Sequence, residues 1–259
     1  MELTENSTFN YASYLRGLFV LIEDRYKNRQ RKNPDTLESE VFKIDPSFTA
    51  ETFLCGLYLL EDTSNAIDNY SEFGLDGPTK YENIGESYLR LYGLLNSTYM
   101  QFVCCREFHK MFKSKSLIKY KKESKNLKIL KVRHSAASHS INYSEDGIRD
   151  FYKISQMTVK GYGERIHVIG EKDDEYEFNI KEDLNKFNKF IGSELSLISH
   201  FLLNKHLDRK SNHFKEFKED LELIDEKAKG SIIIKGGDDK YYHVDTEPPN
   251  IEDILKDLD

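Results

Sequence analysis

The sequence lacks tryptophan and has only three cysteines in 259 residues. Cys55, Cys104 and Cys105 are an odd number and lie in apolar helical patterns without the spacing of metal ligands. Disulfides belong mainly to secreted proteins, and zinc sites need closely spaced ligand pairs. We therefore expect reduced thiols inside a hydrophobic core. Without tryptophan, that core must depend on leucine together with sixteen phenylalanines and sixteen tyrosines.

Motifs for metals and cofactors are also missing. His200, His206 and His213 lie across a helical pattern and a break, and they form no HExxH motif. The GYG at residues 161–163 lacks the third glycine of a dinucleotide-binding loop, and a strand pattern follows it instead of a helix. We expect no metal and no cofactor.

Long apolar runs are absent as well. No stretch approaches the roughly 20 apolar residues that a membrane-spanning helix needs. The N-terminal residues MELTENSTFNY lack the basic start and apolar stretch of a secretory signal. The sequence thus predicts no membrane partner, and we expect a cytoplasmic protein.

Charge is abundant and unevenly placed. The chain carries a net charge of −7, yet residues 106–133, here called the basic segment, hold eleven Lys or Arg against Glu107 and Glu123. The basic segment is therefore +9, and the rest of the chain must be −16. Such a segment either attracts a polyanion to one place or is simply a solvated surface.

Hydrophobic periodicity predicts a mainly α protein, α+β overall: an antiparallel helical bundle with a small β insertion and a C-terminal β-hairpin. Its length suits one large domain or one domain with an added module. Helices are predicted over residues 7–30, 49–70, 80–113, 125–143, 181–208 and 212–228, and strands over 155–160, 165–170 and 175–180, with a hairpin turn at 236–239. In domain terms, residues 1–153 form a helical bundle, 154–180 the β insertion, 181–229 the helices that complete the bundle, and 230–259 the hairpin and acidic tail.

The helical pattern over residues 125–143, KNLKILKVRHSAASHSINY, carries the clearest indication of chemistry. Arg133 falls in the gap between two apolar faces, and a cation flanked by core residues has to be paired, stacked or functional. His139 follows six residues later, about 120° round a helix and about 9 Å along its axis. One straight helix cannot bring both side chains onto one atom.

Arg133, five intervening residues and His139 resemble the Arg-x4–6-His motif of the HEPN family. The preceding helix, whose opening reads YLRLYGLLN, resembles that of bacterial HEPN-like proteins, so the resemblance covers residues 81–143. Many members have asparagine directly after the arginine, and this chain has His134.

The resemblance implies a HEPN-like bundle and a metal-independent endoribonuclease that cleaves RNA at a composite site in a homodimer, with Arg133 and His139 as catalytic residues. It implies a toxin or anti-phage effector, with an antitoxin or another defence-system subunit as a candidate partner. We expect supporting roles for His134, Ser138, Glu86 and Arg90. The predicted RNA-binding residues are Lys119, Lys121, Lys122, Lys125, Lys128 and Lys131.

Two alternatives stay open. The chain could be a non-catalytic HEPN-like RNA-binding or protein-interaction module, or a helical protein in which the motif is a coincidence. The helix over 80–113 carries a stripe formed by Glu86, Arg90, Gly93, Ser97 and Gln101. The small Gly93 and Ser97 would let another helix or a partner approach closely. The stripe is either the solvent face of this helix, or Glu86 or Arg90 supports Arg133 in a cleft.

Overall fold

The computed structural model describes residues 3–30, 42, 44–79, 83–138, 143–145, 148–161, 164–170, 175–235 and 241–244. Within these residues the protein is mainly helical and contains a small three-stranded antiparallel sheet. The helices are α1 (Ser7–Gln30), α2 (Ala50–Phe73), α3 (Ile84–Met111), α4 (Leu117–Ser124), α5 (Lys128–Val132), the π-helix η3 (Arg133–Ser138), α6 (Gln156–Gly161), α7 (Ile180–His206) and α8 (Asn212–Ala228). The strands are β1 (Tyr143–Glu145), β2 (Ile148–Asp150), β3 (Tyr152–Ile154), β4 (Arg165–Gly170), β5 (Glu175–Asn179), β6 (Ile232–Lys235) and β7 (Tyr241–Val244).

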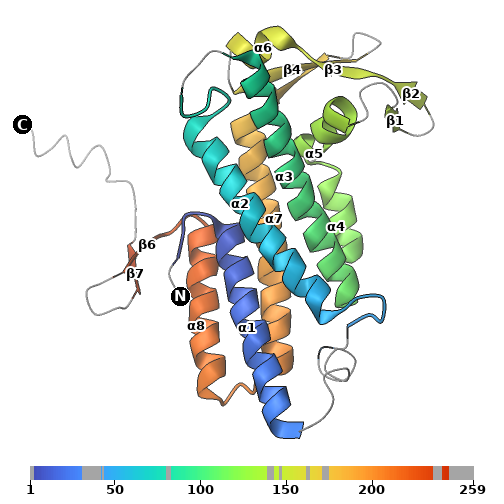
Figure 1. Ribbon diagram of the computed structural model, residues 1–259. Coiled ribbons are helices and arrows are strands. Elements are labelled where there is room, and N and C mark those ends of the chain that lie inside the picture. The colour runs from blue at the N-terminus through green and yellow to red at the C-terminus, as the bar shows by residue number, and fades with distance from the viewer. Residues whose placement is uncertain are drawn as a thin grey trace, which may run out of the picture.

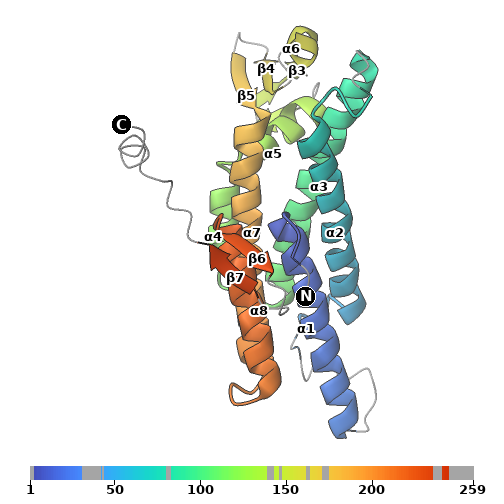
Figure 2. The ribbon, with the colours of Figure 1, turned by 90° about the vertical axis from the view of Figure 1, so that its left-hand side faces the viewer.

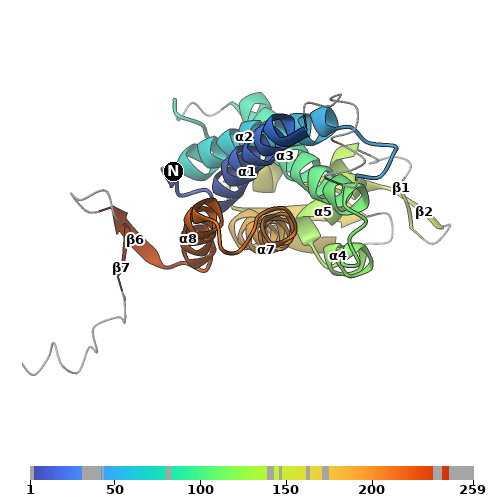
Figure 3. The ribbon, with the colours of Figure 1, turned by 90° about the horizontal axis from the view of Figure 1, so that it is seen from below.

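The long helices lie in two layers. Seen from below, α1, α2 and α3 form one layer, and α8, α7, α5 and α4 form the other (Figure 3). Helix α1 contacts α2, α7 and α8, and α3 contacts both α2 and α7. The three-stranded sheet and α6 lie at one end of the bundle, near the start of α3 and α7 (Figure 1). In the turned view, α7 and α8 lie on the opposite side of the bundle from α2 and α3 (Figure 2).

Local chemistry fixes where the long helices begin. Thr49 and Thr52 form a reciprocal capping box at the start of α2, and Asn83 accepts from the amides of Gly85 and Glu86 at the start of α3. Asn179 and Ser211 cap α7 and α8 in the same way. The predicted limits of these helices are therefore confirmed within a few residues.

The core is built from phenylalanine and tyrosine, as the lack of tryptophan required. Phe19 stacks on Phe42 with ring centres 4.5 Å apart, and Phe53 packs on Phe108 at 4.7 Å. Gly56 of α2 lies directly against α3, because an added Cβ there would be 2.6 Å from the Phe108 ring. This contact does not involve Gly93 or Ser97, the small residues of the α3 stripe.

The interpretation of this stripe as a uniform solvent face is also wrong. Gly93 is exposed, with no described atom within 4 Å of an added Cβ, but Ser97 and Gln101 are buried. The Gln101 amide donates to the Ser64 hydroxyl of α2 at 3.2 Å. A buried amide is stable only when hydrogen-bonded, so this half of the stripe joins two helices.

The sheet has the order β3-β4-β5, and all its pairs are antiparallel. Strands β4 and β5 confirm the prediction, but the predicted strand over 155–160 is wrong, because α6 occupies it and β3 precedes it. The Thr158 hydroxyl donates to the Ser155 carbonyl and accepts from the His167 amide, so it replaces the ladder bonds of a continuing strand.

The predicted C-terminal hairpin is present as β6 paired with β7. Its turn, residues 236–239, and the acidic tail lie outside the described residues. Strands β1 and β2 form a second, unpredicted hairpin.

The predicted helix over residues 125–143 is wrong in its extent. Leu127 is in an extended conformation, α5 contains only five residues, and the π-helix η3 begins at Arg133. The Ser135 hydroxyl donates to the carbonyl of Lys131 at 2.9 Å, which competes with the regular helical bond to that carbonyl. By Tyr143 the chain is in a strand. Arg133 therefore lies beyond the end of the α-helix, and His139 is outside the described residues.

In the part of the chain that the structure describes, no helix is both long enough and apolar enough to cross a bilayer.

Candidate nucleic-acid interface

The guanidinium of Arg133 lies over the ring of Tyr99. Its Cζ atom is 3.6 Å from the ring centre, and Tyr99 comes from the middle of α3. Both side chains are partly buried. The expectation that Arg133 must be paired, stacked or functional is thus met by stacking.

His134 contacts the same aromatic ring from its edge. The two ring centres are 5.1 Å apart, and the planes are inclined by 83°. Nη1 of Arg133 lies 3.4 Å from Nδ1 of His134, a long hydrogen bond in which the guanidinium is the donor. One tyrosine therefore orients two consecutive side chains of the predicted motif.

The rest of the Arg133 guanidinium is available to an anion. A guanidinium carries five N–H donors, and the stack occupies its flat face while leaving the donors at its edge. Among the described residues, no carboxylate forms an ion pair with Arg133, and one donor contacts His134. A cation that is desolvated on one face and not neutralised by the protein attracts phosphate oxygens, which match its planar fork.

A second aromatic ring supports the other side of the π-helix. The Ser135 hydroxyl, fully buried, lies 3.3 Å from the Tyr176 hydroxyl of β5. Lys131 places its ammonium 5.4 Å from the centre of the Tyr176 ring. Helix α3, the α5–η3 segment and strand β5 thus converge around Lys131 and Arg133.

The sequence did not indicate that Tyr99, Tyr176 and Ser135 belong to this site. Tyr99 and Tyr176 lie 34 and 43 residues from Arg133 in the chain, so no local pattern joins them. The one available indication was Ser135 itself, since a serine inside a short helix often bonds back to the preceding turn.

The six predicted RNA-binding lysines are all exposed. Lys119, Lys121 and Lys122 are on α4, whereas Lys125, Lys128 and Lys131 follow it in the chain. Lys131 lies two residues before Arg133, and Lys119 lies 3.7 Å from Glu123 and faces a groove bordered by α7. The structure therefore places Lys119 in a different groove, and Lys131 is the predicted lysine nearest to Arg133 in the chain.

Glu86 and Arg90 are not near Arg133, which corrects their predicted supporting role. Arg90 donates from Nε to the Gly74 carbonyl at 2.6 Å and from Nη2 to the Asn69 carbonyl at 3.2 Å. Tyr99 is nine residues further along α3, about 13 Å at 1.5 Å per residue, and Glu86 is still more distant. Arg90 instead closes the connection between α2 and α3, where a cation satisfies carbonyls at the end of α2.

His139 lies outside the described residues. Ser138 ends η3, but its side chain is not described. The position of the predicted catalytic histidine relative to Arg133 is therefore still a prediction.

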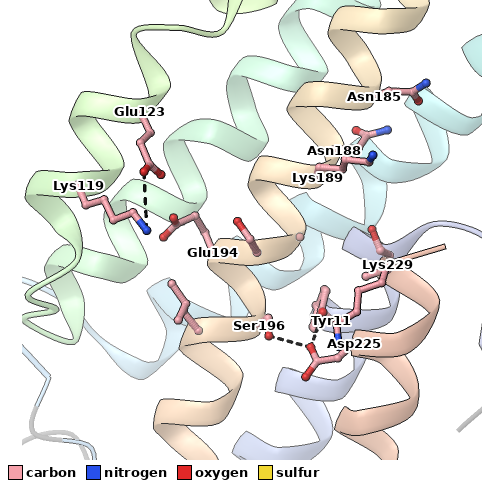
Figure 4. A pocket seen from close by; sticks show the side chains of 15 residues that line it. Tyr11, Lys119, Glu123, Asn185, Asn188, Lys189, Glu194, Ser196, Asp225 and Lys229 are labelled. Carbon is pink, nitrogen blue, oxygen red and sulfur yellow. Dashed lines mark hydrogen bonds and ion pairs between the residues drawn. The ribbon is translucent and has the colours of Figure 1, made fainter. Parts of the chain in front are cut away.

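A separate polar groove of about 850 Å³ runs along α7 between α4 and α8 (Figure 4). Within it, one oxygen of Asp225 accepts from the Tyr11 hydroxyl at 2.6 Å and from the Ser196 hydroxyl at 2.7 Å. Burial, reinforced by Asp225, raises the pKa of Tyr11 far above its usual range.

The other Asp225 oxygen lies 2.8 Å from Nε2 of His200. Serine, histidine and aspartate do not form a hydrolytic triad here, because Ser196 bonds to the carboxylate and a nucleophile must bond to the histidine. Asp225 instead connects α1, α7 and α8. Within the described ranges, no group of three or more metal-ligating side chains is present.

Comparison of the chain with models of protein families, with curated proteins and with solved structures gave no match.

Proposed function

We propose that this protein is a HEPN-like endoribonuclease that binds the RNA backbone through Arg133 and cleaves it without a metal ion. The observation that supports the proposal best is the Arg133 guanidinium held on Tyr99 with its donor edge free of carboxylates from the described residues. Lys131 lies two residues before it and adds positive charge. A preorganised cation needs little rearrangement when a phosphate arrives.

In the proposed reaction, the RNA 2′-hydroxyl attacks the adjacent phosphorus, a new O–P bond forms, and the bond to the 5′-oxygen breaks. One imidazole takes the 2′-hydroxyl proton, and an acid protonates the leaving oxygen. His139 is proposed for one of these roles because imidazole titrates near neutral pH. Arg133 neutralises the charge that develops on the phosphorane. The products are a 2′,3′-cyclic phosphate and a 5′-hydroxyl.

The proposed homodimer now depends on the family resemblance. The geometric argument assumed a straight α-helix from Arg133 to His139, and the α-helix ends at Val132. Light scattering at micromolar concentration tests the assembly, and a monomer that still cleaves RNA would remove the composite site from the mechanism.

A non-catalytic module is the second candidate, and one observation favours it. The contacts of Arg133 and His134 with Tyr99 fasten η3 to α3, so Arg133 has a packing role whether or not RNA is cleaved. In this reading, Arg133 matters for folding and His139 does not matter for activity.

The test is to incubate the purified protein with total RNA in the presence of a chelator, using wild type, Arg133→Ala and His139→Ala. We expect the wild type to cleave and both variants to be inactive with unchanged helical content by circular dichroism. Growth arrest by the wild type alone, expressed without an antitoxin, is the expected cellular counterpart. RNA left intact with chelator, divalent ions or nucleotides present would favour the non-catalytic module.

A further inference from the structure

A second concave site, distinct from the Arg133 region, lies between the end of α3 and the middle of α7. It is a cavity of about 360 Å³, within the range of small-molecule sites. Its inner wall is formed by buried Phe108, Phe112 and Ile198. Leu197 and Phe201 also line it and are 49% and 42% exposed, so apolar surface at the cavity is open to solvent.

The polar side of this cavity is cationic. Residues 113–116, which connect α3 to α4, read Lys-Ser-Lys-Ser, and all four line the cavity. Lys113 and Lys115 are exposed. Lys113 lies 3.8 Å from Asp45, a long and exposed pair, and no ion pair to Lys115 is found among the described residues. Positive charge next to an aromatic wall suits an anion with an apolar body.

Lys113 occupies a backbone conformation that normally belongs to glycine. Its φ is +51°, and the amides of Lys113 and Ser114 donate to the carbonyls of Lys110 and His109. This is the hydrogen-bond pattern of a Schellman motif, in which glycine is the usual residue at the position of Lys113. Lys113 therefore lies at the cavity in a backbone conformation that glycine would adopt with less strain.

One polar group lies on the inner wall. His109 is 1% exposed, and its Nε2 lies 2.7 Å from the Glu194 carboxylate of α7. A carboxylate accepts, so Nε2 donates a hydrogen bond to Glu194. Nδ1 is buried, and no described group bonds to it. A buried ring nitrogen without a partner suits a ligand that brings a polar group.

We propose that this cavity binds a small aromatic anion, with its ring against Phe112 and Phe201 and its carboxylate or phosphate at Lys113 and Lys115. The ring centres of these phenylalanines are 6.2 Å apart, so the two rings contact each other and form one aromatic surface. A polar group on the ligand forms a hydrogen bond with Nδ1 of His109. The site is independent of the Arg133 region and of RNA cleavage.

The test uses two fluorescent probes that differ in charge. 1-Anilinonaphthalene-8-sulfonate has an aromatic body, an N–H donor and a negative group, and N-phenyl-1-naphthylamine lacks only the negative group. We expect saturable one-to-one binding of the sulfonate and weaker binding of the neutral probe. Displacement by phenyl phosphate or by phenylacetate then distinguishes a phosphate ligand from a carboxylate.

Two pairs of variants locate the binding. Lys115→Glu is expected to weaken sulfonate binding about fivefold, the scale of one exposed ion pair. Lys122→Glu, an equally exposed lysine of α4 outside the cavity, should leave it unchanged. Phe201→Ala is expected to weaken the binding of both probes. Leu89→Ala replaces a 74% exposed residue of α3 outside the cavity and should change the binding of neither probe.

Lys113→Gly separates binding from folding. Glycine relieves the backbone strain at φ +51°, so the melting temperature should rise while sulfonate binding weakens. Equal binding by Lys115→Glu, Phe201→Ala and the wild type would overturn the proposal, as would stronger binding by Lys113→Gly. Either result stands apart from RNA cleavage, which uses none of these side chains.

Discussion

Arg133 lies with its guanidinium carbon 3.6 Å from the centre of the Tyr99 ring. The contact orients the proposed phosphate-binding cation and also fastens the π-helix η3 to α3. The positioning and packing roles of Arg133 therefore share one partner, and substitutions at Tyr99 and Arg133 can separate them.

Tyr99→Leu removes the aromatic face under Arg133, and Tyr99→Phe keeps it. We expect the leucine variant to lose about 0.5–2 kcal/mol of stability from the lost cation–π contact, together with RNA affinity. The phenylalanine variant should keep both. Chemical denaturation and RNA titration measure the two effects, and equal RNA binding by both variants would show that the stack does not position Arg133 for RNA.

Lysines near Arg133 should contribute more to RNA binding than Lys119. The double variant Lys128→Glu/Lys131→Glu is expected to weaken RNA binding. The slope of log K against log salt concentration should also fall in magnitude by about 0.7 per lost phosphate contact. Lys119→Glu should change little, because Lys119 is near Glu123 in another groove. Titrations at several salt concentrations test this, and equal losses in both variants would assign the whole basic segment to RNA binding.

The cysteines should differ in reactivity. Cys55 is exposed, whereas Cys104 and Cys105 are buried. Burial raises the pKa of the Cys104 thiol to about 12 and that of Cys105 well above its usual value, so the reactive thiolate is scarce at both. Mass spectrometry after iodoacetamide treatment should find one modified cysteine in the native protein and three in denaturant. Rapid modification of all three would show that α3 opens readily.

His206 should make the protein less stable in mild acid. Burial, helped by the neighbouring Lys205 charge, lowers the pKa of His206 from 6.5 to about 4. Between these values the unfolded chain binds the proton and the folded chain does not, so stability is complete above pH 6.5 and is lost as the pH falls toward 4. The loss should be on the order of 1–2 kcal/mol, after discounting for the partial exposure of the ring.

The control for this prediction is His206→Gln, which cannot titrate in this range. Its unfolding free energy, measured from pH 7 to pH 4, should fall less than that of the wild type. Parallel curves for the two proteins would mean that other groups cause the acid sensitivity.

The long helices could be predicted from the sequence because their caps and apolar periods are local. Thr49, Asn179 and Ser211 each act within three residues. The first strand of the sheet could not be predicted, because the Thr158 hydroxyl binds the backbone of β4 at His167, nine residues further along and beyond the period-two pattern of one strand. The same holds for the candidate site: the pattern indicated that Arg133 needs a partner, but only tertiary packing brings Tyr99 to it.

The proposed contact between Arg133 and an RNA phosphate is measured by comparing two variants in their affinity for single-stranded RNA: His139→Ala, which keeps the RNA intact, and Arg133→Ala/His139→Ala. Loss of one charge-assisted contact, about 1.5–3 kcal/mol, should weaken binding by about tenfold or more. The slope of log K against log salt concentration should fall in magnitude by about 0.7. Identical affinities and slopes in two folded variants would show that Arg133 does not bind the RNA backbone.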